Sequence, residues 1–562
     1  MRKTLWSALL VGLLGSVPLV GRAAEGTDAG LKPLVAVSVS SYDQILKNIA
    51  FIGQLGGDSS LGKEAETAFK QALQTENLAG LDKTRPCGLV VQTDGQQQFP
   101  VFGFVPVTDL KAFLKSLEPA VGKAEEEKGV YEIGVRGNPL YVQEKKGWAF
   151  IANSSEILAH VPADPLPLLG GLDKTYDLAV QVTFKNIPPF IRMMMMAPLQ
   201  SGFQQGMDRR PGETDEQYNV RTKVGRQALE QVTQVLGDLD TFVLGVAVDQ
   251  AAATARLEYS LTALPGTKTA KQMADATKGS LKTALAGLRQ TDAAVMAYKV
   301  GELSEGDAAQ IQSAIDSGKQ NAVQELEQQG LRDEQVQQAK KLLGQMIDVV
   351  KETLADRKLD VGVAAWMNAK LLTVVAGSRA ANTAKLDKLV KEVAAQAIKD
   401  DGDVASMIKL DAQKYLGFRF HTASVPMSNL GELPRLRQLV GESLEIAVAI
   451  GDDSFYVAAG RDPVAKLKQV IQQSQAQAGK ASGPGEVVAD MTPISEVVAA
   501  VADEGGKPVA EKIHGILQKS PGKSHITLTP VTIPGGVRVR VEFQEGLLRL
   551  IGASKSLANQ AQ

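Results

Sequence analysis

Residues 359–393 read LDVGVAAWMNAKLLTVVAGSRAANTAKLDKLVKEV, two apolar runs of strand length with a short turn between them and a helical stretch after them. Residues 444–471, LEIAVAIGDDSFYVAAGRDPVAKLKQVI, have the same order of elements. The two segments also share their endings, because VAG and AAG are followed by AKLDKLV and AKLKQVI. Short apolar runs between turn residues favour strands, and apolar residues three and four apart indicate a helix. The segments therefore predict a repeated unit, which is a β-hairpin followed by a helix.

Further copies of this unit extend the pattern over most of the chain. Residues 87–118 contain a clear copy, and weaker copies occupy 138–161, 241–274 and 523–551. On a larger scale the order of strands and long helical stretches before about residue 276 recurs after residue 291. We therefore predict an α+β fold with two similar halves, each a mostly antiparallel or mixed sheet built from hairpin–helix units with long helices packed on one face. The predicted domains are 24–283 and 284–562, the second an internal duplicate of the first.

The N-terminal 23 residues have the features of an export signal. Arg2 and Lys3 form a basic start, residues 5–20 are apolar, and the small residues Gly21 and Ala23 stand at −3 and −1 of a cut after Ala23. An uncleaved anchor helix is the alternative, although the apolar run is short for a hydrocarbon core of about 30 Å. No later apolar run approaches the length of a transmembrane helix, so none is expected after cleavage. The predicted location is periplasmic or extracellular, in a bacterial envelope.

Composition excludes some classes of function. The 61 Lys and Arg residues nearly balance the 63 Asp and Glu residues, which gives a formal charge of −2. A nucleic-acid binder is therefore not expected, because neutralising phosphates requires an excess of clustered basic residues. The single cysteine, Cys87, forms no intrachain disulfide, and its place in the apolar run CGLVVQ predicts a buried strand position.

The motifs for catalysis, metal and phosphate are incomplete. Residues 57–63 have the spacing of a phosphate-binding loop, but Glu64 stands where a Ser or Thr must contact the magnesium ion. The four histidines lack the spacing of metal ligands, and no nucleophile elbow is present. His421 as a base, and calcium held by Asp400, Asp401 and Asp403, remain alternatives to a core histidine and a solvated turn. We accordingly predict no catalytic, cofactor-binding or metal-binding residues, and an enzyme is less favoured than a binding protein.

One segment is unusually apolar for its position. Met193 to Met196 follow Pro188, Pro189 and Phe190, and four consecutive methionines occupy every side of a helix. Flexible thioether side chains adapt to irregular apolar partners. Packing between the sheet and a second helical layer is the favoured interpretation, with an apolar contact surface and a copper site as alternatives. The possible contact residues are Phe190, Met193, Met194, Met195, Met196 and Leu199.

With its leader MRKTLWSALLVGLLGSVPLVGRAAEG and its unit endings AKLDKLV and AKLKQVI, the chain resembles uncharacterised exported α+β repeat proteins of planctomycete-type bacteria. The resemblance implies a similar layout and no activity or site residues. Two functional hypotheses remain. The first is a non-enzymatic exported envelope protein that binds a protein partner or an apolar ligand, or acts structurally. The second is an extracytoplasmic hydrolase whose site is assembled from residues distant in sequence.

Overall fold

A computed structural model of the chain describes residues 30–558 except 97, 136, 210, 277–280, 290–291, 329–331, 401 and 431–433. The predicted signal peptide and its cleavage site lie outside these residues. The described chain combines helices with an antiparallel sheet, so the predicted α+β class is confirmed. Among the described helices, none has both the length and the apolar character needed to cross a membrane.

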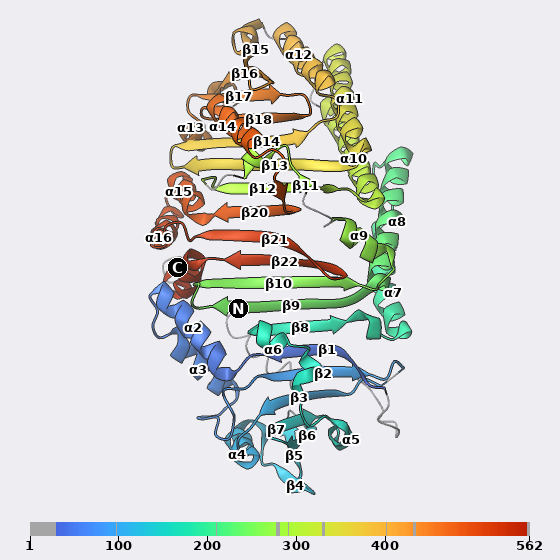
Figure 1. The fold of residues 1–562 in the computed structure, drawn as a ribbon, viewed down its shortest axis with the longest axis vertical. Helices are drawn as coiled ribbons and strands as arrows, with labels where there is room; N and C mark the ends of the chain where they lie inside the picture. Colours follow the sequence, from blue (N-terminus) through green and yellow to red (C-terminus); the bar gives the residue numbers. More distant parts are fainter. Residues whose placement is uncertain are drawn as a thin grey trace.

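Twenty strands form one continuous antiparallel sheet (Figure 1). From one outer edge to the centre they are β4 (Glu125–Glu127), β5 (Val130–Val135), β6 (Asn138–Lys145), β7 (Trp148–Ala152), β3 (Val101–Pro106), β2 (Cys87–Thr93), β1 (Lys32–Val39), β8 (Leu178–Thr183), β9 (Leu239–Asp249) and β10 (Thr254–Ala263). From the other edge to the centre they are β15 (Ile408–Tyr415), β16 (Phe418–Pro426), β17 (Ser443–Ile450), β18 (Ser454–Gly460), β14 (Leu371–Arg379), β13 (Lys358–Asn368), β12 (Val295–Glu302), β20 (Gly485–Asp490), β21 (His525–Ile533) and β22 (Gly536–Phe543). A separate small sheet pairs β11 (Leu281–Lys282) with β19 (Ala481–Ser482).

The strands of the two parts are arranged in the same order. In each part the strand nearest the centre is the last along the chain, and the fourth strand lies at the outer edge, when β11 and β19 are left out of the count. The two parts meet where β10 pairs with β22, from Ala255 opposite Phe543 to Thr262 opposite Gly536. One edge-to-edge pairing therefore makes two sheets into one.

Pairs of helices follow corresponding strands of the two parts. After β1 come α2 (Tyr42–Gly56) and α3 (Leu61–Ala72); after β8, α7 (Pro189–Gly206) and α8 (Asp215–Asp238); after β12, α10 (Glu305–Gln328) and α11 (Asp333–Ala355); after β20, α15 (Met491–Val501) and α16 (Lys507–Leu517). The other helices are α4 (Leu110–Val121), α5 (Ser155–His160), α6 (Leu172–Thr175), α9 (Lys268–Ala276), α12 (Thr383–Asp400), α13 (Pro434–Val440), α14 (Pro463–Ala476), α17 (Glu545–Gly552) and α18 (Ser554–Ala558). Short 3-10 turns are η1 (Leu166–Leu169), η2 (Phe184–Asn186), η3 (Ala286–Leu288), η4 (Gly402–Ser406) and η5 (Met427–Leu430).

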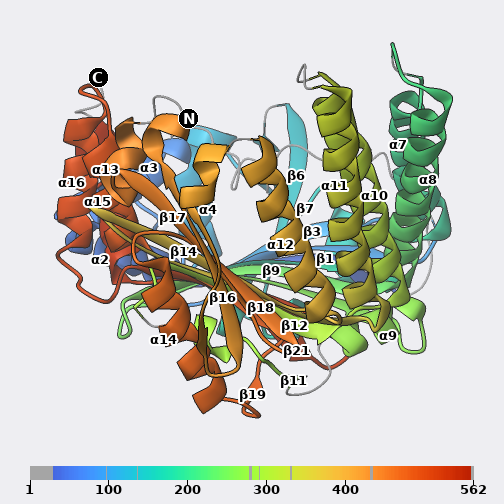
Figure 2. The same ribbon diagram turned by 90° about the horizontal axis from the view of Figure 1, so that it is seen from above.

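The helix pairs stand along the two ends of the central strands. Figure 1 shows α7, α8, α10 and α11 beside one end, and α2, α3, α15 and α16 beside the other. Seen from above, both groups rise on the same side of the sheet, whereas α14 lies on the opposite side (Figure 2). The sequence predicted long helices on one face only, and α14, a helix of 14 residues, departs from that prediction.

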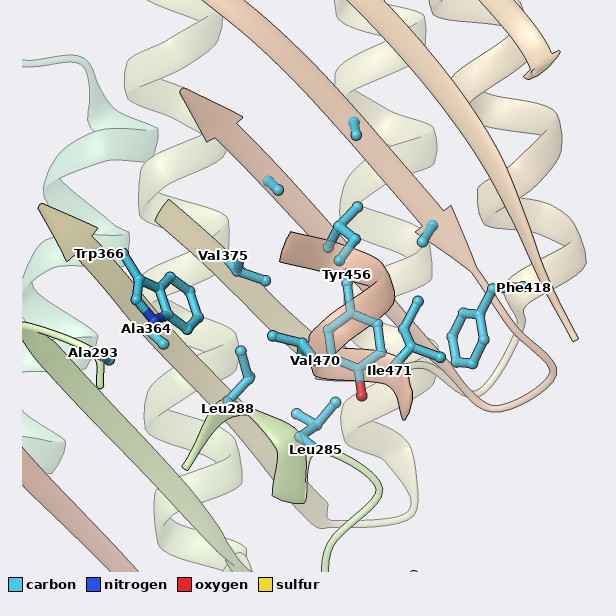
Figure 3. Close-up of a cluster of buried hydrophobic side chains, with 14 of the residues drawn as sticks. Leu285, Leu288, Ala293, Ala364, Trp366, Val375, Phe418, Tyr456, Val470 and Ile471 are labelled. Carbon is cyan, nitrogen blue, oxygen red and sulfur yellow. The ribbon is translucent and has the colours of Figure 1, made fainter. Parts of the chain in front are cut away.

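The two faces of the sheet differ in what packs on them. Because successive residues of a strand point to opposite faces, each face can be followed by register. We call the face that carries Leu244, Tyr259 and Leu528 the open face, and the opposite one the covered face. On the covered face of the second part, Tyr456 from the sheet packs with Val470 and Ile471 of α14 (Figure 3). Most of the described hydrophobic core lies on the covered face, and α4 covers the open face only over the outer strands of the first part.

The segment that connects the two parts packs against the hydrophobic core of the second part. Leu285 and Leu288, in and beside η3, are buried against the covered face (Figure 3). Asp360 of β13 accepts hydrogen bonds from the Thr283 hydroxyl at 2.8 Å and from the Ala284 N–H at 2.7 Å. Burial raises the pKa of the Asp360 carboxyl even though both donors act to lower it. These contacts fix the connection across the predicted junction.

Candidate functional site

A continuous row of apolar residues crosses the open face. In the spatial order of the sheet, each strand from β2 across to β17 contributes one residue. Each of these residues is directly paired with the next one on the neighbouring strand. In spatial order the row is Cys87, Val39, Leu178, Val246, Leu257, Val541, Leu528, Val487, Ala297, Val363, Ala376, Val457 and Val448. With neighbouring strands about 4.8 Å apart, the row extends on the order of 50 Å.

The middle of this face is accessible to solvent. Leu244 and Val246 of β9 are 39% and 38% exposed, and Tyr259 of β10 is 38% exposed. Across the junction, Leu528 and Val487 are 38% and 40% exposed. Leu244 pairs directly with Tyr259 in the first part, and Leu528 pairs with Val487 in the second, so each part places two exposed apolar residues side by side near the junction. An exposed apolar patch of this kind marks a binding surface more often than isolated apolar residues do.

The charges of β10 and β22 lie on the covered face. In β22 the valines at 537, 539 and 541 point to the open face, and Arg540 points to the covered one. There Glu258, only 2% exposed, accepts hydrogen bonds from Arg540 and from the Tyr176 hydroxyl, which lies 2.9 Å away. Burial acts to raise the pKa of Glu258, but the donors Arg540 and Tyr176 outweigh it and hold the pKa below its usual range. The centre of the sheet therefore buries the Glu258 carboxylate beside a half-buried Arg540 on the covered face, and it leaves Leu244 and Leu528 exposed on the open face.

The methionine segment of α7 lies at the surface. Met193, Met194 and Met195 are 69%, 65% and 45% exposed, so the predicted packing between the sheet and a second helical layer is wrong for these three residues. Met196 is half-buried, and the side chain of Leu199 lies outside the described ones. The Phe190 ring packs edge-on against Phe99, with centroids 6.2 Å apart. The segment presents exposed apolar surface, as the alternative interpretation required.

A serine–histidine contact links α15 to α16. Ser495 Oγ lies 2.9 Å from His514 Nδ1, and the serine hydroxyl donates to the Thr492 carbonyl at 2.7 Å. The Gln518 side-chain nitrogen lies 2.8 Å from His514 Nε2 and donates to it, which leaves the proton on Nδ1. His514 then donates to Ser495, whereas a general base must accept the proton of its nucleophile. This pair of a buried serine and a half-buried histidine joins two helices and does not activate the serine.

His421 belongs to a charge network beneath α12. Its Nδ1 accepts from the Asp411 N–H at 3.1 Å, so Nε2 carries the proton and donates to Asp387 at 2.9 Å. Asp387, Asp411 and His421 are close enough together to hold a metal ion. Lys391, however, lies 3.1 Å from Asp387 and 2.8 Å from Asp411, and Arg419 lies 3.3 Å from Asp387. These cations already neutralise the carboxylates, so the network ties α12 to β15 and β16.

The remaining motifs also have structural roles. Residues 57–60 connect α2 to α3, and residues 61–63 begin α3, whereas a phosphate-binding loop would follow a strand. Glu64 accepts from Ser60 and from Lys555, the latter at 2.6 Å. Cys87 begins the open-face row, and burial raises the pKa of its thiol to about 11. In the acidic cluster, Asp403 lies in η4 and Asp401 lies outside the described residues.

Sequence reasoning predicted the strands but not the open face. The signal that could have indicated this face is the Val–Arg alternation of β22 together with the aliphatic strands paired around it. That pattern does not show which face of the sheet the rest of the chain covers. Comparison with known proteins adds no constraint, since no family model, no curated protein and no solved structure matches the chain.

Proposed function

We propose that this chain is an exported envelope protein that binds an apolar ligand on the open face and catalyses no reaction. The observation that carries the proposal is the set of exposed aliphatic and aromatic residues on the central strands at both sides of the junction, among them Leu244, Tyr259 and Leu528. Burying such surface contributes roughly 25 cal/mol per Å² of apolar area, before the costs of association.

The surroundings of the open face favour a narrow ligand. Helices stand along both ends of the central strands on one side of the sheet (Figure 2). α4 packs over the outer strands of the first part through Phe113 and Leu114, and α12 reaches β16 through Asp387. The open face is therefore bordered by helices, and a ligand of small cross-section, such as a hydrocarbon chain, can lie on it without meeting them.

The binding proposal is tested with two substitutions on one strand. Leu528 and Val531 of β21 are 38% and 42% exposed, but they point to opposite faces. We expect Leu528→Gln to weaken binding of the uncharged fluorescent probe phenylnaphthylamine severalfold, because a polar side chain replaces apolar contact at the middle of the row. Val531→Gln is the matched control and should bind the probe as the parent protein does. Equal binding by both variants would contradict the proposal.

Export and duplication belong to the same proposal. A mature N-terminus at Ala24 in the extracytoplasmic fraction would support the signal peptide, and a full-length cytoplasmic product would contradict it. The identical strand order in the two parts supports an internal duplication of residues 24–283 as 284–562. An experimental structure in which the two parts do not superpose strand for strand would contradict the duplication.

A hydrolase remains the second candidate, and the contact between Ser495 and His514 is the observation that favours it. The direction of the hydrogen bonds and the burial of Ser495 weigh against it. A panel of ester and peptide substrates tests this candidate. Turnover that disappears in Ser495→Ala, with unchanged unfolding, would favour the hydrolase over the binding protein.

A further inference from the structure

One charged side chain interrupts the open face. We consider the described strands that lie between β3 and β17 in the spatial order of the sheet, these two included. Away from the strand ends, their open-face positions carry a single charge, Lys299 in β12. Lys299 is exposed, and no carboxylate of the described residues lies within ion-pair distance of it. A lysine among aliphatic neighbours adds a fixed positive charge to a surface that is otherwise without one.

The neighbours of Lys299 leave space beside its side chain. Its cross-strand partner on β13 is Val361, and its partner on β20 is Gly485, which has no side chain. The apolar row crosses the same two strands two residues from Lys299 and Gly485, at Ala297 and Val487. A group that contacts the lysine can therefore lie over Gly485 while the rest of the same molecule follows the row.

We propose that the open face binds an amphiphile with one long hydrocarbon chain and a carboxylate headgroup, the headgroup at Lys299 and the chain along the row toward Val246. This inference rests on the proposed function and names its ligand class. Opposite charge argues for the anionic group, because a lysine ammonium and a carboxylate form a charge-assisted hydrogen bond. The part of the row from Ala297 to Val246 crosses five strand intervals, roughly 24 Å, and an acyl chain spans about half of a 30 Å hydrocarbon core, so the row is long enough.

A second copy of this chain fits the face less well. Two sheets pack face to face about 10 Å apart. The helices along both ends of the strands rise above the open face (Figure 2), so the helices of two copies would meet before their sheets reached that distance. A single hydrocarbon chain meets no such obstacle.

The test compares two ligands that differ only in charge. Oleate and methyl oleate are each titrated against phenylnaphthylamine bound to the parent protein, to Lys299→Gln and to Lys409→Gln. Lys409 is an exposed lysine on the edge strand β15 and serves as the matched control. We expect Lys299→Gln to weaken oleate binding about tenfold, since it removes the charged partner, and to leave methyl oleate binding unchanged. Lys409→Gln should change neither.

The outcomes separate the two proposals. If the parent protein binds both ligands and Lys299→Gln binds oleate as tightly as the parent does, the headgroup assignment is overturned and the proposed function stands. If the parent binds neither oleate, methyl oleate nor the probe, the proposed function itself fails. If sedimentation shows a dimer that Leu528→Gln dissociates, a second copy occupies the face and the amphiphile proposal is overturned.

Discussion

The two faces of the central strands differ in what they bury and what they leave in solvent. On the covered face Glu258, Arg540 and Tyr176 form a hydrogen-bonded network, and larger apolar clusters lie under α14 and α5. On the open face the same strands expose Leu244 and Tyr259. The difference teaches that one sheet can bury polar and apolar residues on one face and leave apolar surface in solvent on the other, which is the face where we propose binding. The covered face supplies the core, and the open face keeps apolar surface available.

A matched pair of tyrosines gives the largest expected contrast. Tyr456 on the covered face is fully buried, and its hydroxyl donates to the Ala284 carbonyl at 3.1 Å and lies 3.0 Å from Ser474 Oγ. Tyr456→Ala should lower the free energy of unfolding by about 3–5 kcal/mol, because it leaves a cavity and unpaired polar groups. Tyr259→Ala on the open face should cost about 1 kcal/mol. Urea unfolding measures both, and equal losses would break the distinction between the faces.

The ion pair between the buried Glu258 and Arg540 provides the next contrast, which depends on pH. Glu258→Gln should lower the free energy of unfolding at pH 7 by about 2–3 kcal/mol, because Arg540 loses its charged partner. The folded-state pKa of Glu258 lies below its unfolded value, so its contribution is present above the unfolded pKa of about 4.3 and is lost as pH falls through the folded pKa.

The pH profile of Glu258→Gln distinguishes this origin from a packing defect. The difference in free energy of unfolding between the parent protein and the variant should shrink as the pH falls below about 4, over the range in which the parent is folded. Val531→Gln, exposed on the same face, serves as a control without a titrating group. A difference that stays constant with pH would show that the substitution acts through packing and not through the charge.

The smallest expected effect concerns the methionines of α7. The double variant Met194→Ser and Met195→Ser should change the free energy of unfolding by less than about 0.5 kcal/mol, since both side chains are already in solvent. Probe binding should weaken less than in Leu528→Gln. A fall in the free energy of unfolding by more than about 2 kcal/mol would show that these residues belong to the core. The buried region would then include this part of α7, which the structure places at the surface.

Local sequence signals located elements better than their boundaries. The run CGLVVQT predicted a strand, and β2 spans Cys87–Thr93. Asp462 stands before Pro463, a pattern typical of an N-cap, but Asp462 has a φ of 49° and its side chain makes no capping hydrogen bond. Thr492 before Pro493 is the same pattern, whereas α15 begins at Met491 and Asp490 caps it by accepting from the Thr492 N–H. The cap depends on the backbone that enters the helix, and a residue pattern alone does not set it.

What the sequence determined by itself was the alternation of each strand. The valines and arginines of β22 had to point to opposite faces, because side chains alternate along any strand. Which face would be covered was decided by contacts between residues far apart in the chain. Glu258 receives Tyr176 from 82 residues before it and Arg540 from 282 residues after it, so the charged side is the buried one. Likewise, nothing in the sequence distinguishes Lys299 from other lysines. The pairing of β12 with β20, which is distant in the chain, places Lys299 on an apolar face. Alternation is a local property of the backbone, whereas burial depends on what the rest of the chain packs against it.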